Sequence, residues 1–294
     1  MAMSSSAGEH LTLDPDDRRA SVLSFIRGAS RTLCFTVFRC DDVDVARSLA
    51  AAQRRGVDVR VLITNRAKGS KWALRALRKY LARQDVTVTT YDGPLSHYHA
   101  KYAVADEARA LIGSLNYTTE CFSTTSDYLV ETADTEVVST LSRLFAHDTT
   151  TPWDTFGFAS ASPRLIIGPD GSRERWAALL GSSRSSVLIA DPKLSDRELE
   201  GVLDERRRRG VRIARAATRT FEGLRLHGKA VVVDDRLAIV GSQSLSRKSL
   251  ERRRELSLIL SDPRHVRALE RHITGLAPQP AGVGIPVLRS GRAA

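Results

Sequence analysis

Residues 99–114 read HAKYAVADEARALIGS, and residues 227–242 read HGKAVVVDDRLAIVGS. Both stretches place a histidine two positions before a lysine, an aspartate five positions after that lysine, and Gly-Ser at the end. The positions between them are mostly apolar, as is typical of strands. Residues two apart on a strand point to the same side, so each histidine would lie beside its lysine. The two stretches therefore predict two equivalent strand-based units.

The repetition continues outside these stretches. An Arg-Arg-Gly-Val segment occurs at residues 54–57 and again at residues 208–211. Each follows a helix-like stretch and opens a strand-like one, and its glycine is typical of a helix end. The helix before the second segment is expected to start at Ser195, because Glu198 three residues later completes a capping box. Strands that alternate with helices in both halves predict an α/β fold.

We expect two similar α/β/α sandwich halves that pack about a pseudo-twofold axis, which brings equivalent motifs together. The first half is assigned to residues 1–150 and the second to residues 151–294. A stretch rich in Thr, Ser and Pro at residues 148–163 is expected to link them. The tail at residues 275–294, with its scattered Gly and Pro, is expected to be peripheral.

The first half is longer before its motif. The two Arg-Arg-Gly segments lie 154 residues apart, whereas the two histidine motifs lie 128 residues apart, a difference of 26. The additional residues are expected to form a helix at residues 69–83 and a strand at residues 86–91.

Both histidine stretches resemble the H-x-K-x4-D-x6-G-S-x-N signature of the phospholipase D superfamily. Composition alone predicts about 0.17 His-x-Lys pairs in this chain, so two pairs in matched surroundings are not a chance result. The resemblance covers most of the chain from about residue 30 to residue 260 and implies a phosphodiesterase with a phosphohistidine intermediate. It also implies that the reaction needs no metal and no other cofactor.

The two histidines and two lysines carry the chemistry that the resemblance implies. A neutral imidazole is a competent nucleophile near pH 7, and a protonated imidazole is a competent acid. His99 is assigned as the nucleophile because the first-half histidine has this role in the superfamily, and His227 as the acid; the reverse assignment stays open. Lys101 and Lys229 would hold the non-bridging phosphate oxygens in the transition state.

The other motif positions are expected to support this centre. A carboxylate lies 28 residues after each histidine, and we expect it to hydrogen-bond a histidine ring. Ser244 stands where the signature has Asn, so the second half would have fewer phosphate donors unless Gln243 or Ser244 compensates. The hydroxyls of two serines and one amide are expected to donate to the phosphate, and the motif aspartates to act as structural supports. These residues are Asp127 and Glu255 (ring partners, with Glu131 as an alternative to Asp127), Ser114, Ser242 and Asn116 (donors), and Asp106 and Asp234 (supports).

The remaining histidines are interpreted as structural. His97 lies two positions before His99, which is a spacing seen in metal sites, but the sequence offers it no further ligand cluster. We therefore expect no metal site. Structural roles are expected for His10, His147, His265 and His272.

The formal net charge of +11 and the pI of about 10.0 favour a polyanionic partner. Three cysteines without metal or disulfide spacing, no signal-peptide pattern and no apolar run long enough for a bilayer favour a cytoplasmic protein. Because both motifs lie in one chain, a monomer with a pseudo-dimeric site is possible.

Three functions are compatible with these features. The first is a nuclease that cleaves DNA or RNA, with single strands favoured, as suggested by the high pI and by the arginine run at residues 252–254, directly before Glu255. The other arginine run, at residues 206–209, is interpreted as a solvated helix face. The second is a phospholipase D or a cardiolipin-synthase-like phosphatidyl transferase acting on anionic phospholipid. Trp72, Trp153 and Phe156 are the conspicuous apolar candidates for contact with acyl chains. The third is a non-catalytic nucleic-acid-binding module, which two intact motifs argue against.

Overall fold

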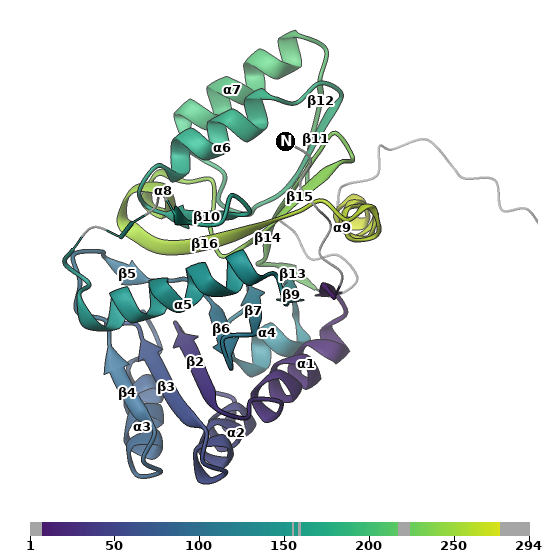
Figure 1. Ribbon diagram of the computed structural model, residues 1–294. Coiled ribbons are helices and arrows are strands. Elements are labelled where there is room, and N and C mark those ends of the chain that lie inside the picture. The colour runs from purple at the N-terminus through teal and green to yellow at the C-terminus, as the bar shows by residue number, and fades with distance from the viewer. Residues whose placement is uncertain (1–7, 155, 158–159, 217–223, 277–294) are drawn as a thin grey trace, which may run out of the picture.

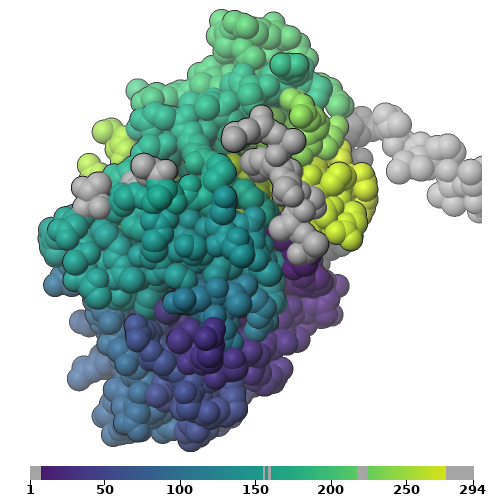
Figure 2. Space-filling view, in the orientation of Figure 1, coloured from purple at the N-terminus to yellow at the C-terminus, as the bar shows by residue number. Residues whose placement is uncertain are grey.

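The computed structural model describes residues 8–154, 156–157, 160–216 and 224–276. Two mixed sheets lie between three layers of helices, with helix α5 running between the sheets (Figure 1). The first-half residues, purple to teal, and the second-half residues, green to yellow, meet along a broad contact (Figure 2). The predicted α/β sandwich class is confirmed.

The first sheet belongs to the first half. Its strands β2, β3 and β4 run parallel to one another, and the remaining strands are antiparallel to their neighbours. In spatial order they are β1 (His10–Thr12), β9 (Leu129–Thr132), β7 (Arg109–Gly113), β6 (Tyr102–Ala105), β2 (Thr32–Val37), β3 (Asp58–Ile63) and β4 (Thr87–Thr90).

The outer face of this sheet is covered by helices whose apolar stripes face inward. Helix α2 shows how the sequence starts one, because the Asp42 side chain accepts hydrogen bonds from the backbone N–H groups of Asp44 and Val45. The four helices are α1 (Pro15–Arg27), α2 (Val43–Arg54), α3 (Lys71–Ala82) and α4 (Thr119–Ser123). Helix α3 and strand β4 confirm the additional helix and strand predicted for the first half.

The second sheet has the same mixed character. Strands β11 and β12 are parallel, and β10, β16, β15, β14 and β11 follow one another in antiparallel order. Its strands are β10 (Leu165–Gly168), β16 (Arg253–Leu260), β15 (Leu237–Gly241), β14 (Lys229–Val233), β11 (Ser186–Ala190) and β12 (Arg212–Arg215). Its outer helices are α6 (Ser172–Gly181), α7 (Arg197–Arg208) and α8 (Arg247–Arg252).

The central layer joins the halves. Helix α5 (Thr135–Thr150) and helix α9 (Pro263–Leu276) contribute to one buried apolar cluster that includes the inner faces of both sheets. Because this core is shared, the division into residues 1–150 and 151–294 stays a prediction. None of the described helices combines the length and apolarity needed to span a bilayer.

Two short strands cross from one half to the other. Strand β5 (His97–Tyr98) pairs in parallel with β16, placing His97 opposite Arg253. Strand β13 (Arg225–Leu226) pairs in parallel with β8 (Thr125–Ser126), placing Arg225 opposite Thr125. This reciprocal exchange is what a pseudo-twofold axis would produce, although the axis itself stays a prediction.

Two local predictions are wrong. The expected linker does not begin at residue 148, because Asp148 is a buried residue of α5 and the hydroxyls of Thr149 and Thr150 donate to carbonyls of the same helix. Helix α7 is capped by Asp196 and not by Ser195; the Asp196 carboxylate accepts the backbone N–H of Leu199. The expected peripheral tail lies outside the described residues from residue 277 onward.

Candidate active site

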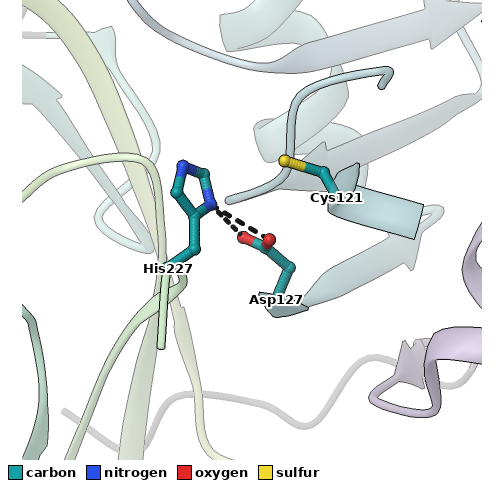
Figure 3. Close-up of side chains that lie close together, drawn as sticks. All are labelled: Cys121, Asp127 and His227. Carbon is teal, nitrogen blue, oxygen red and sulfur yellow. Dashed lines mark hydrogen bonds and ion pairs between the residues drawn. The ribbon is translucent and has the colours of Figure 1, made fainter. Parts of the chain in front are cut away.

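The two motif histidines are each held by a carboxylate from the opposite half. His99 Nδ1 lies 2.8 Å from Glu255 Oε2, and His227 Nδ1 lies 2.9 and 3.0 Å from the two oxygens of Asp127. Figure 3 shows the second of these pairs. A carboxylate accepts, so Nδ1 carries the proton in both rings and Nε2 presents its lone pair. The crossed pairing makes each half incomplete without the other.

The exchanged strands bring these groups together. The backbone N–H of His99 donates to the Arg254 carbonyl at 2.8 Å, and that of His227 to the Ser126 carbonyl at 3.4 Å. Gly228, which separates His227 from its lysine, packs so closely that an added Cβ would lie 2.5 Å from the Tyr128 ring. A side chain at this position would therefore force either Tyr128 or the segment that carries His227 to move.

The motif lysines lie beside their histidines, as the strand spacing predicts. Lys101 Nζ donates to the His99 carbonyl at 2.6 Å, and Lys229 Nζ donates to the His227 carbonyl at 2.7 Å. Both are buried, at 1% and 7% relative exposure. Among the described residues neither lysine forms an ion pair with a carboxylate, so both amino groups are available to an anion.

The carboxylates are fixed by hydroxyl groups. Asp127 accepts hydrogen bonds from Ser114 Oγ at 2.6 Å and from Thr125 Oγ1 at 2.5 Å. Glu255 accepts a hydrogen bond from Ser249 Oγ at 2.9 Å. Sequence reasoning missed Thr125 and Ser249, because neither belongs to the repeated pattern. Cys121 stands 128 residues before Ser249, so the two halves build this support from different positions.

The expected phosphate donors are engaged elsewhere. Ser114 donates to Asp127, and Ser242 Oγ both accepts from and donates to the backbone of Leu256. These two hydroxyls support the carboxylate and the strand, which corrects the prediction that they bind the phosphate. The amide Nδ2 of Asn116 lies 3.8 Å from Cys121 Sγ, and its Oδ1 is buried without a hydrogen-bond partner in the described part of the chain.

Ser244, which replaces the expected Asn, has a different partner. Its hydroxyl lies 2.9 and 3.0 Å from the two carboxylate oxygens of Asp191, and Asp191 also accepts the backbone N–H of Leu245. Gln243 accepts a hydrogen bond from the indole of Trp176. The Ser244 hydroxyl is thus occupied, whereas Nε2 of Gln243 is buried and forms no hydrogen bond within the described residues.

Asp106 and Asp234 support the fold at a distance from the site. Each occupies a turn with positive φ at the end of its strand away from the motif lysine. Asp106 accepts the backbone N–H groups of residues 30–32, and Asp234 those of residues 184–186. They therefore act as structural supports, at the strand ends that lie away from the motif lysines. The alternative ring partner Glu131 is wrong, since it forms an ion pair with Arg109 at 2.7 Å.

Burial and the two lysines set the protonation states. Burial lowers the pKa of His99 to about 3, and repulsion from Lys101 and Lys229 acts in the same direction. Burial and the same lysines also lower the pKa of His227. Burial lowers the pKa of Lys101 to about 7, assisted by repulsion from Lys229. Both rings are thus neutral near pH 7, and a bound anion would raise these pKa values again.

The carboxylates are ionised despite their burial. Burial opposes ionisation of Asp127, but attraction to His227 and hydrogen bonds from His227, Ser114 and Thr125 lower its pKa to about 2. Attraction to His99 and Lys101 lowers the pKa of Glu255 in the same way. Anionic acceptors keep the Nδ1 protons in place and raise the basicity of Nε2.

Cys121, Asp127 and His227 are close enough to be considered as metal ligands, with one ligand atom of each within 4.8 Å of the others (Figure 3). Both Asp127 oxygens and His227 Nδ1 are already hydrogen-bonded to each other and to hydroxyl groups. Burial raises the pKa of Cys121, which disfavours the thiolate that binds metal. These donors fit a metal ion poorly, and metal independence stays a prediction. His97 Nδ1 lies 3.1 Å from the hydroxyl of Ser96.

A family profile described as "Cardiolipin synthase, PLD-like domain" matches residues 22–149 and 191–276. The chain belongs to this family. Each matched segment contains one histidine–lysine motif, so this PLD-like chain carries two motif copies of the phospholipase D superfamily.

A curated relative covers part of the PLD-like chain. "Mitochondrial cardiolipin hydrolase" of Xenopus laevis is 30% identical over 133 residues, which are 44% of this chain and 60% of that protein. The mouse protein of the same name is 27% identical over 135 residues, 46% of this chain and 58% of that protein. The chain therefore spans less than two thirds of the length of these relatives.

A solved structure shares the fold across both halves. Phosphatidylserine synthase from Haemophilus influenzae Rd KW20 superposes with a TM-score of 0.71 at 12% identity, covering 92% of this chain and 87% of that chain. Polyphosphate kinase from Porphyromonas gingivalis gives a TM-score of 0.74 at 18% identity, covering 90% of this chain and 46% of that one. At these identities the likeness concerns the fold alone.

Proposed function

We propose that this PLD-like chain is a metal-independent phosphodiesterase that cleaves nucleic acid, with single strands preferred, through a phosphohistidine intermediate. The observation that carries the proposal is the crossed pairing of His99 with Glu255 and of His227 with Asp127, next to two buried lysines. This arrangement offers one nucleophile, one acid–base group and two lysine amino groups, each beside its own histidine.

The first chemical step uses both histidines. Nε2 of His99 attacks phosphorus, forming a P–N bond while the bond between phosphorus and the leaving oxygen breaks. His227, protonated on Nε2 in the substrate complex, transfers that proton to the leaving oxygen. Lys101 and Lys229 hold the non-bridging oxygens, where negative charge must be stabilised.

The second step releases the phosphoryl group. His227, now neutral, accepts a proton from a water molecule as that water attacks phosphorus. The P–N bond breaks and its electron pair returns to Nε2 of His99. Glu255 holds the Nδ1 proton of His99 throughout, so the ring leaves as a neutral imidazole. Both histidines end the cycle in their starting states.

Charge and access support nucleic acid as the substrate. The net charge of +11 favours a polyanion. His99 and Lys101 have relative exposures of only 9% and 1%, so the scissile phosphate must enter a buried site. A flexible single strand can present one phosphate in this way more readily than a stiff duplex. Three free cysteines fit a reducing compartment, and we propose that the chain acts in the cytoplasm.

A phospholipid phosphodiester is the second candidate. The matched family description and the curated relatives name cardiolipin. An apolar pocket of about 390 Å³ lies between α2 and α3, with the side chain of Val43 in its lining and 57% exposed. Trp72 at the start of α3 is 77% exposed and stacks with Arg75, a combination suited to a membrane interface.

One experiment separates these candidates. Purified wild-type protein and the His99→Ala variant are incubated in EDTA with a labelled single-stranded oligonucleotide, and in parallel with phosphatidylglycerol vesicles. Cleavage of the oligonucleotide by the wild type alone is the expected result. Release of a lipid headgroup without cleavage of the oligonucleotide would contradict the nuclease and identify a phospholipid as the substrate. Wild-type protein that binds the oligonucleotide but cleaves neither substrate would favour a binding module.

A further inference from the structure

The two sides of the active site are built alike but carry different charges. Strand pair β5–β16 flanks His99, and strand pair β13–β8 flanks His227. Each member of one pair lies 128 residues from its counterpart in the other, and so do the short helices α8 and α4 beside them. Equivalent positions can therefore be compared directly.

The side next to His99 is cationic. His97 faces Arg253 across the strand pair, and Arg253 Nη1 lies 3.8 Å from Glu255 Oε1. Nε of Arg253 is buried and forms no hydrogen bond with any of the described residues. Lys248 of α8 is exposed. The counterparts of His97 and Lys248 in the other half, Arg225 and Glu120, form an ion pair at 2.6 Å, so His97 and Lys248 occupy neighbouring positions. The charges of Arg253 and Lys248 also lower the pKa of His97.

This cationic group is adjacent to the nucleophile. The Phe38 ring contacts both histidines edge-on, with centroid distances of 4.4 Å to His99 and 6.1 Å to His97. The Thr64 hydroxyl donates to the Arg66 carbonyl and accepts the backbone N–H of Tyr98 at 3.3 Å. The loop that carries Arg66 is therefore held beside the strand that carries His97. A phosphate here would lie next to a phosphate bound at His99.

The corresponding positions beside His227 are neutral as a group. Arg225 takes the place of His97, and Glu120 takes the place of Lys248. These two residues neutralise each other in an ion pair of 2.6 Å. Thr125 takes the place of Arg253 and donates its hydroxyl to Asp127. The described residues at these positions thus offer an anion no net charge.

We propose that His97, Lys248 and Arg253 form a subsite for a second phosphate of the substrate, adjacent to the scissile one. The subsite fixes the direction in which the substrate lies, because the substrate extends past His99 and not past His227. This inference rests on the proposed phosphodiesterase function. A second phosphate is supplied by the next nucleotide of a nucleic acid or by a phospholipid that carries two phosphates.

The test exchanges the charges of the two sides. Lys248→Glu gives the His99 side the residue of the other side, and Glu120→Lys does the reverse. Arg208→Glu on the exposed surface of α7 is the control with the same change in charge as Lys248→Glu. Steady-state kinetics are measured with a single-stranded oligonucleotide and with bis(p-nitrophenyl) phosphate, which has a single phosphate.

For Lys248→Glu we expect KM for the oligonucleotide to rise about tenfold. The slope of log KM against log salt concentration should decrease by about one, the value for one lost phosphate contact. The effect on bis(p-nitrophenyl) phosphate should be much smaller. Glu120→Lys should lower KM for the oligonucleotide, and Arg208→Glu should leave it within about twofold. Equal effects of Lys248→Glu on both substrates, or equal effects of Lys248→Glu and Arg208→Glu on the oligonucleotide, would overturn the subsite.

A substrate other than nucleic acid would contradict the proposed nuclease without contradicting the phosphate subsite. If the wild type hydrolyses bis(p-nitrophenyl) phosphate but no oligonucleotide, vesicles of cardiolipin, with two phosphates, are compared with vesicles of phosphatidylglycerol, with one. A larger effect of Lys248→Glu on cardiolipin would assign the subsite to a lipid. Calorimetric binding of tripolyphosphate and orthophosphate to the full chain gives a readout that needs no turnover. Wild-type protein that binds both anions equally would refute the subsite.

Discussion

Replacing Lys101 by methionine should make the protein more stable and less active. The ammonium of Lys101 is buried, and its pKa falls from 10.5 to about 7. A shift of this size corresponds to roughly 5 kcal/mol against the charged form at neutral pH. The variant also loses the hydrogen bond to the His99 carbonyl and the contact with the Phe38 ring, and each loss offsets about 1 kcal/mol of this gain in stability.

Allowing for imperfect packing of the new side chain, the net gain for Lys101→Met is about 2 kcal/mol in the free energy of unfolding at pH 7. The gain should depend on pH. Between about pH 10.5 and 7 the unfolded chain binds a proton at Lys101 that the folded chain does not, so wild-type stability is lost as the pH falls through this window. The advantage of the variant is therefore full below pH 7 and fades towards pH 10.5.

Urea denaturation at several pH values measures this difference, with Lys79→Met on the exposed face of α3 as the control. The turnover of bis(p-nitrophenyl) phosphate should fall about 10²–10³-fold in Lys101→Met, as expected when a transition-state donor is lost. A variant that is less stable than the wild type at pH 7 would refute the reasoning. So would a gain that does not change with pH.

Other contacts of the site and the interface lead to further predictions. Asp148→Asn leaves the buried side chain of Arg254 without its charge partner and should lower the free energy of unfolding by about 3–5 kcal/mol. Denaturation by guanidinium chloride measures this loss, and an unchanged denaturation midpoint would contradict the role of the pair. Asp127→Asn should lower kcat by about 10²–10⁴-fold with little change in KM, because the ring of His227 loses its anionic acceptor; equal losses in kcat and in thermal stability would indicate a structural role alone.

The sequence predicted the fold class and which residues gather at the site better than it predicted how those residues pair across the two halves. The spacing of the two motifs identified His99, Lys101, His227 and Lys229, because strand geometry alone places residues two apart on one side. The crossing of the carboxylates could not be predicted. Whether Glu255 binds the histidine of its own half or of the other depends on how two sheets pack, and no local pattern encodes that packing.

Residues that have a role in only one half could not be predicted from the repeat either. Thr125 and Ser249 fix the two carboxylates from positions that do not correspond, so a comparison of the repeats passes over both. The end of α5 was misread for a physical reason. Thr149 and Thr150 favour loops in general, but here their hydroxyls bond to helix carbonyls while Asp148 is held by Arg254 of the opposite half.

The covalent intermediate is the central claim, and it can be observed directly. Wild-type protein is mixed with bis(p-nitrophenyl) phosphate in EDTA, denatured rapidly, digested and examined by peptide mass spectrometry. We predict a p-nitrophenyl phosphoryl adduct on His99 that is absent from His99→Ala. The adduct should accumulate in His227→Ala, because p-nitrophenolate leaves without needing a proton but the adduct then lacks the base for its hydrolysis. An adduct found only on His227 would reverse the assignment, and turnover without any adduct, or turnover abolished by EDTA, would contradict the mechanism.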